Sequence, residues 1–265
     1  MSSNTATVLE IKIPSYCEVK VHHSICLELH RLIERILNVI LAIESARPNY
    51  ASAMQTLCSL HSTLAKAKSV IKHCSESSKL YLAITSHKIL SRCQKIRNAF
   101  ELYLAQIQNA VPMPLASKIS AILHDLRDTE FFLEFEEEEA RKVVLSLLEK
   151  NFPDSASMEK EELEAIQIAT SRLEIKTPFS FWAEKATLKR QLEQVNGTNL
   201  KEKELLQYLL YLLIKYGNFI CQIQDGNHSL KRECHDQSFE HKLVVDEAIS
   251  ENQVNDYLNP HVGDI

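Results

Sequence analysis

The chain has 265 residues, of which 45% are hydrophobic and 25% charged, and its formal net charge is −5. A chain of this length can bury a substantial core, and its mild acidity gives no general attraction to nucleic acid. The four glycines and seven prolines are too few for a sheet protein with frequent glycine-rich turns, and they favour long helices joined by few loops.

Apolar residues at steps of three and four predict the first two helices. The first covers about residues 18–45 and ends before Pro48, whose ring would clash with the preceding turn. The second covers about residues 50–74, and the serines after it could cap the next helix. The residues expected to face inward are Ile25, Leu29, Leu32, Ile33, Ile36, Leu37, Ile40 and Ile43 in the first helix, and Met54, Leu57, Leu60, Leu64 and Ile71 in the second.

The same spacing predicts three more helices before residue 150. The third covers about residues 79–111, and a slip of one residue in its apolar spacing predicts a kink or restart at Thr85. Pro112 ends it, and Pro114 suits the first turn of the fourth, where the missing N–H costs nothing. The fifth follows Asp128. Expected inward residues are Leu80, Ile84, Ile89, Cys93, Ile96, Phe100, Leu104 and Ile107, then Leu115, Ile119, Ile122, Leu123 and Leu126, then Phe132, Phe135, Val143, Val144, Leu147 and Leu148.

The rest of the chain contains shorter helical patterns. We expect helices over about residues 161–175, 179–195 and 200–223, and the third should be buried on several sides because residues 205–214 are apolar nearly all round. The fold class is therefore all-α, an up-and-down helical bundle extended by further C-terminal helices. The expected parts are a flexible N-terminus (1–16), the bundle (17–150), an exposed linker (151–160), the C-terminal helical part (161–223) and a mostly disordered tail (224–265).

Cysteine usage and the ends of the chain indicate the cellular compartment. Seven cysteines are dispersed without a C-x-x-C pair, which is typical of free thiols in a reducing compartment. The N-terminus has neither the basic start nor the apolar run of a secretory signal. The richest apolar run, residues 205–220, is interrupted and shorter than the roughly 20 residues that a bilayer span needs. We expect the protein in the cytoplasm or the nucleus.

Two constellations resemble sites of metal or thiol chemistry. His22, Cys26 and His30 are four residues apart on one helix face, but together they extend over about 12 Å and cannot reach one tetrahedral ion. We interpret the histidines as surface residues. His73 and Cys74 are neighbours and so do not face each other, which makes Cys74 a small buried thiol at a helix end and not an activated nucleophile. We expect no catalytic, metal or cofactor site.

Charge is distributed unevenly along the chain. Between residues 66 and 97 a single acid, Glu76, accompanies eight bases: Lys66, Lys68, Lys72, Lys79, Lys88, Arg92, Lys95 and Arg97. Residues 128–164 carry thirteen acids against four bases, including the run Glu134 to Glu139, which we interpret as a solvated helix start. The basic and acidic helices could lie side by side. The basic face could also meet anionic lipid at about 1 kcal/mol per residue. Solvated faces are the interpretation that we favour.

Several sequence blocks, in order and at sensible spacing, carry a resemblance to a known family. They are I-E-S-A-R-P (43–48), L-C-S-L (57–60), A-K-A-K (65–68), H-C-S-E-S-S-K-L-Y-L-A-I-T (73–85), Q-I-Q-N-A-V-P (106–112) and E-K-E-L-L-Q-Y-L-L-Y-L-L-I-K-Y-G (202–217). Together they resemble the N-terminal helical domain of plant U-box ubiquitin ligases of the armadillo-repeat type, over about residues 17–223.

The resemblance implies a role in protein ubiquitination. In that family the helical domain precedes a U-box, which positions a ubiquitin-charged conjugating enzyme. The expected Cys-Pro-Ile type opening of a U-box does not occur in this sequence, so we expect no ligase activity from the chain alone and a conjugating enzyme as partner only if a U-box follows. We expect a regulatory module that binds substrates or signalling and trafficking proteins through unknown residues. The alternatives are a helical bundle on anionic membranes and a stand-alone competitor of the full ligase.

Overall fold

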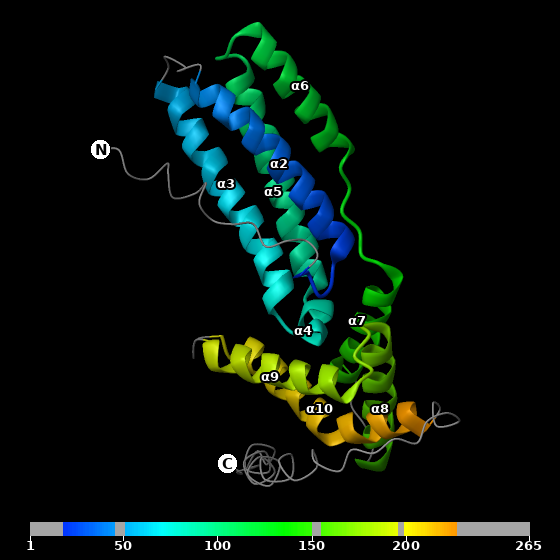
Figure 1. The fold of residues 1–265 in the computed structure, drawn as a ribbon. Coiled ribbons are helices and arrows are strands. Elements are labelled where there is room, and N and C mark those ends of the chain that lie inside the picture. The colour runs from blue at the N-terminus through cyan, green and yellow to red at the C-terminus, as the bar shows by residue number, and fades with distance from the viewer. Residues whose placement is uncertain (1–17, 46–50, 150–154, 196–198, 227–265) are drawn as a thin grey trace.

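The computed structural model of the protein describes residues 18–45, 51–149, 155–195 and 199–226, and these form nine α-helices and no strand (Figure 1). The all-α prediction is confirmed. The predicted flexible N-terminus lies outside the described residues, as does the predicted tail from residue 227 on. Residues 224–226, expected in the tail, belong to the last helix.

Four long helices form an up-and-down bundle. They are α2 (His23–Ser45), α3 (Ala51–Glu76), α5 (Ser86–Gln108) and α6 (Met113–Asp128). Neighbours along the chain pack together, and α6 returns to contact α2, which closes the bundle. The predicted inward stripes are buried almost throughout, with Phe100 fully enclosed. Met54 is an exception, because its side chain at the start of α3 is 49% exposed.

A short helix, α4 (Lys79–Ile84), separates α3 from α5. Its N-cap is Ser78, whose hydroxyl accepts a hydrogen bond from the amide of Tyr81. The predicted break at Thr85 is confirmed: Thr85 ends α4 and directly precedes α5. All five residues from Leu80 to Ile84 are buried, because α4 lies between the bundle and the helices that follow (Figure 1).

Four helices form a second group across the end of the bundle where α4 lies (Figure 1). They are α7 (Phe135–Glu149), α8 (Ser155–Arg172), α9 (Pro178–Gln194) and α10 (Leu200–Gly226). α7 packs on α4 and α8, and α10 packs on α9, α8 and α4. The expected burial of α10 on several sides is confirmed, and its close approach to α9 uses Gly217, where a Cβ would lie 3.2 Å from Cδ1 of Phe181.

Two predictions about this group are wrong in detail. Residues 129–134 are not helical, and Phe132, Phe135 and Leu148, expected to face inward, are 63%, 69% and 46% exposed. Residues 155–160, expected in an exposed linker, form the first turns of α8. Serine and aspartate favour helix starts as well as loops, so composition alone could not separate the two. The division of the chain near residues 151–160 remains a prediction.

The length and hydrophobicity of the helices in the described ranges bear on whether any of them could span a bilayer. None of them is both long enough and apolar enough to cross a membrane.

Candidate functional site

His22 lies at the centre of the contact between the bundle and the second group of helices. Its side chain is fully buried, and its backbone is in the left-handed region with φ of 67°. The backbone amide donates to Oε1 of Glu137 at 2.6 Å, and Nδ1 lies 2.8 Å from Oε2 of the same carboxylate. Nε2 faces the carbonyl oxygen of Leu82 at 3.2 Å. Both ring nitrogens therefore face acceptors, and the imidazolium form satisfies both.

The protonation of this pair is a balance between burial and attraction. Burial alone would lower the pKa of His22, but the hydrogen bond and the charge of Glu137 raise it. Burial alone would raise the pKa of Glu137, but the hydrogen bonds and charge of His22 lower it. The interpretation of His22 as a surface residue is wrong, and so is that of Glu137 as part of a solvated run, because the two form one ion pair between α7 and the start of α2.

Three thiols are enclosed next to this pair. Cys26, Cys74 and Cys93 belong to different helices of the bundle and are fully buried. Burial raises the pKa of Cys93 to about 12, which keeps it a neutral thiol. Cys74 is the buried thiol at a helix end that the sequence predicts. Within the described part of the chain, no group of three or more histidines, cysteines and acids is arranged to hold a metal ion.

The turn between α3 and α4 is held by α9. Glu184 is buried, and its Oε1 accepts from the hydroxyl of Ser78 at 2.6 Å and from the amide of Leu80 at 2.9 Å. The amide of Ser78 donates to Oε1 of Gln191 at 2.8 Å, and Arg190 donates to the carbonyl oxygen of Glu76 at 3.0 Å. One carboxylate thus satisfies two buried donors of a turn more than a hundred residues away.

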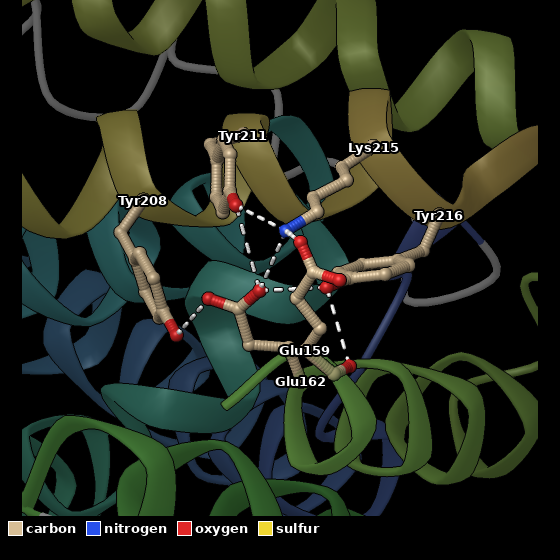
Figure 2. A network of polar contacts seen from close by, with 6 residues as sticks. All are labelled: Glu159, Glu162, Tyr208, Tyr211, Lys215 and Tyr216. Atoms are coloured by element: carbon tan, nitrogen blue, oxygen red, sulfur yellow. Dashed lines mark hydrogen bonds and ion pairs between the residues drawn. The ribbon is translucent and has the colours of Figure 1, made fainter. Parts of the chain in front are cut away.

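A second buried carboxylate joins α8 to α10. Four side chains of α10 donate to Glu162, as Figure 2 shows: Tyr208, Tyr211, Lys215 and Tyr216. The shortest of these bonds is 2.7 Å from the hydroxyl of Tyr216. Lys215 also reaches Glu159 at 3.1 Å. Burial and the carboxylate raise the pKa of Tyr208 and of Tyr216, so these two tyrosines remain neutral donors.

Neither carboxylate was predicted to be a buried acceptor, although the sequence contains a signal for each. Glu162 precedes buried Ile166 by four residues, and Glu184 follows buried Phe181 by three. Both acids therefore stand on inward stripes of their helices. An acid at such a position indicates a polar contact inside the fold.

A cleft of about 650 Å³ opens beside the α3–α4 turn. It is lined by the ends of α3 and α9 and the start of α10, and its residues are mostly polar; they include His73, Ser77, Arg190, Gln194, Asn199 and Glu202. The hydroxyl of Ser77 lies 3.0 Å from Nδ1 of His73. Ser77 is itself buried, so this pair does not present its hydroxyl for attack on a substrate.

The basic residues between positions 66 and 97 do not form one solvated face. Lys68 is buried, the ammonium of Lys79 donates to the carbonyl oxygen of Leu173 at 2.8 Å, and Arg97 donates to that of Thr129 at 2.8 Å. Ion pairs of the acidic run join His22, His87 and Arg172 to Glu137, Glu138 and Glu139. α7 does lie beside α4, which belongs to the basic segment. None of these three pairs, however, joins an acid of the run to a lysine or arginine between positions 66 and 97.

Comparisons with known proteins identify relatives of the chain. No family model matches it, and no solved structure matches it. U-box domain-containing protein 5 of Arabidopsis thaliana is 44% identical over 170 residues, which are 64% of this chain and 23% of the relative. U-box domain-containing proteins 6 and 7 of the same plant are 35% and 34% identical over 83% and 84% of this chain, and over 29% of each relative.

The chain thus spans less than a third of the length of these relatives. The matched residues make up most of the chain, and the identity is above 30% in each case. The resemblance read from the sequence is confirmed: over most of its length, the chain is homologous to a segment of plant U-box domain-containing proteins.

Proposed function

We propose that this chain is a partner-binding module of a plant U-box ubiquitin ligase and acts in protein ubiquitination. The observation that supports the proposal is the similarity at 34–44% identity to U-box domain-containing proteins. A U-box positions a charged conjugating enzyme, and another part of such a ligase must then select what is modified. The described helices suit selection, because they form a connected core that holds exposed helix faces in fixed positions.

The buried contacts favour a rigid scaffold over a reactive centre. Glu137, Glu162 and Glu184 each bond to groups on other helices, so these carboxylates stabilise the arrangement of helices. The side chains left at the surface include several large apolar residues, such as Phe132, Phe179 and Trp182. Exposed aromatic residues of this kind mark protein interaction sites.

Proximity labelling in plant cells tests the proposal. The full chain fused to a biotin ligase is expressed beside a helical control protein of similar mass, and ubiquitin-modified peptides are measured with and without the gene for this chain. We expect a set of proteins labelled by the chain and not by the control, whose ubiquitin-modified peptides decline when the gene is removed. A labelled set equal to that of the control, or one with unchanged ubiquitination, would refute the proposed function.

A further inference from the structure

The surface of α9 carries a row of exposed residues along its whole length. Phe179, Trp182, Ala186, Lys189 and Glu193 are all exposed and follow one another at steps of three, four, three and four. This is the spacing of the contact positions through which one helix packs along another. The opposite side of α9 is buried through Phe181, Glu184 and Leu188. We call the exposed residues the outer row of α9.

The two aromatic residues of the outer row contact each other. The rings of Phe179 and Trp182 stack with centroids 6.3 Å apart, although the residues are 75% and 59% exposed. Thr177 and Ser180 form a capping box that fixes the first turn of the helix. Phe181, between the two aromatics, is buried against Gly217 of α10. Because the two rings already contact each other, ordering these side chains when a partner binds would cost little entropy.

The other end of the outer row is basic. Lys189 and the adjacent Arg190 are exposed, and Glu193 is the exposed acid beside them. The remaining acid of α9, Glu184, is buried and bonded to Ser78 and Leu80. Lys189 and Arg190 thus outnumber Glu193 by one on this side of α9, and Arg190 keeps its charge while it donates to the carbonyl oxygen of Glu76. An acidic partner complements this excess of positive charge.

The charges near the aromatic pair indicate a narrow partner instead of a membrane surface. Arg172 and Lys176, which precede α9 in the chain, are paired with Glu139 and Glu174. The excess positive charge thus lies toward the C-terminal end of α9 and does not surround the aromatics. A plane of anionic lipid would favour a broader basic surface.

We propose that the outer row of α9 docks an acidic amphipathic helix of a partner protein. Apolar residues of that helix would cover Phe179 and Trp182, small Ala186 would permit close approach, and its acids would face Lys189 and Arg190. The proposal rests on the proposed function and names where a partner binds. A second copy of this chain is a poorer fit, because three acids of its acidic run, Glu137, Glu138 and Glu139, are already paired with its own residues.

Trp182 is the single tryptophan of the chain, so its emission reports on this surface directly. The probe is a synthetic helical peptide of three heptads with leucine at the heptad contact positions and glutamate at most others. The matched probe has lysine in place of each glutamate. We expect the glutamate peptide to shift the emission to shorter wavelength and to bind more weakly as salt is added, and the lysine peptide to do neither.

Variants locate the binding surface, with anisotropy of the labelled peptide as a second readout that does not need Trp182. Phe179→Ala and Trp182→Ala should each weaken binding about tenfold or more, and joint charge reversal of Lys189 and Arg190 to glutamate about fivefold. The matched control is Phe219→Ala, which removes an aromatic residue that is 50% exposed on α10. Phe219 lies about 200° around that helix from Gly217, which faces α9, so its removal should leave binding unchanged.

Four outcomes would overturn the docking site. The first two are that the glutamate peptide does not bind, or that both peptides bind equally. The third is that anionic vesicles shift the Trp182 emission and the glutamate peptide does not. The fourth is that the emission shifts with protein concentration alone, which would indicate that a second copy of the chain covers the surface. The proposed function is tested separately. A chain that keeps its specific neighbours in proximity labelling but binds no acidic peptide retains that function and lacks this site.

Discussion

The buried ion pair between His22 and Glu137 should contribute strongly to stability. The change Glu137→Gln keeps the size of the side chain and removes its charge. His22 then retains the carbonyl oxygen of Leu82 but loses the carboxylate that accepted from both its amide and its ring. Removing one partner of a buried pair costs about 3–5 kcal/mol. The side-chain amide oxygen introduced at position 137 can still accept one hydrogen bond, and the imidazole of His22 can lose its proton. We therefore expect a smaller loss, about 2–3 kcal/mol in the free energy of unfolding.

The loss of stability in Glu137→Gln should depend on pH in a defined direction. The pKa of His22 is raised above its ordinary 6.5, so the stability it provides is complete below that pH and declines as pH rises through the folded-state pKa. The pKa of Glu137 is lowered below its ordinary 4.5, so its contribution is complete above that pH and declines as pH falls through the folded-state pKa. The difference between wild type and variant should therefore be largest between about pH 4.5 and 6.5 and decrease on both sides.

Urea unfolding followed by circular dichroism and by Trp182 emission measures the difference at several pH values. The control is Glu136→Gln, which removes the same charge from the exposed neighbouring residue and should change stability by less than about 0.5 kcal/mol. A Glu137→Gln variant as stable as this control, or a difference that increases from pH 6.5 to pH 9, would refute the reasoning.

Three further predictions concern other buried polar groups. Glu184→Ala leaves two buried donors of the α3–α4 turn without their acceptor and should lower the free energy of unfolding in urea by about 2–4 kcal/mol, whereas Glu193→Ala, on the exposed side of the same helix, should change it little. In Glu162→Gln, Tyr208 and Tyr216 should ionise at lower pH than in the wild type, because the carboxylate that helps to raise the pKa of each is gone; unchanged absorbance at 295 nm during alkaline titration would contradict this. Ser86 is fully buried, and its hydroxyl has no hydrogen-bond partner within the described part of the structure. Ser86→Ala should therefore leave stability unchanged or raise it by up to about 1 kcal/mol in thermal or urea unfolding, and a marked loss would reveal a partner for that hydroxyl.

The helices of this protein were predictable because their periodicity is local information. The slip in apolar spacing after Ile84 placed the break at Thr85 correctly. Pro112 located the boundary less well, because α5 ends earlier, at Gln108, and Pro112 is the N-cap of α6. The exposure of Met54 and Phe132 was not predictable in this way. Whether an apolar residue near the edge of a stripe is covered depends on a neighbouring helix that periodicity does not place.

The polar contacts between helices were not predictable from spacing. His22 and Glu137 are separated by 115 positions, and the patterns around them suggested a surface histidine and a solvated acidic helix start. Only the packing of α7 against α4 and the bundle brings them together. For Glu162 and Glu184, the inward helix position could have been read from the sequence, but their partners could not.

The support of the α3–α4 turn by Glu184 has a consequence for the order of events during synthesis. Ser78 and Leu80 precede their acceptor by 106 and 104 positions. At about 5–20 residues per second, the ribosome needs about 5 to 20 s to add that length of chain. The four helices of the bundle can thus emerge and associate while this turn still has water as its partner. The two donors of the turn find their protein acceptor only when α9 arrives.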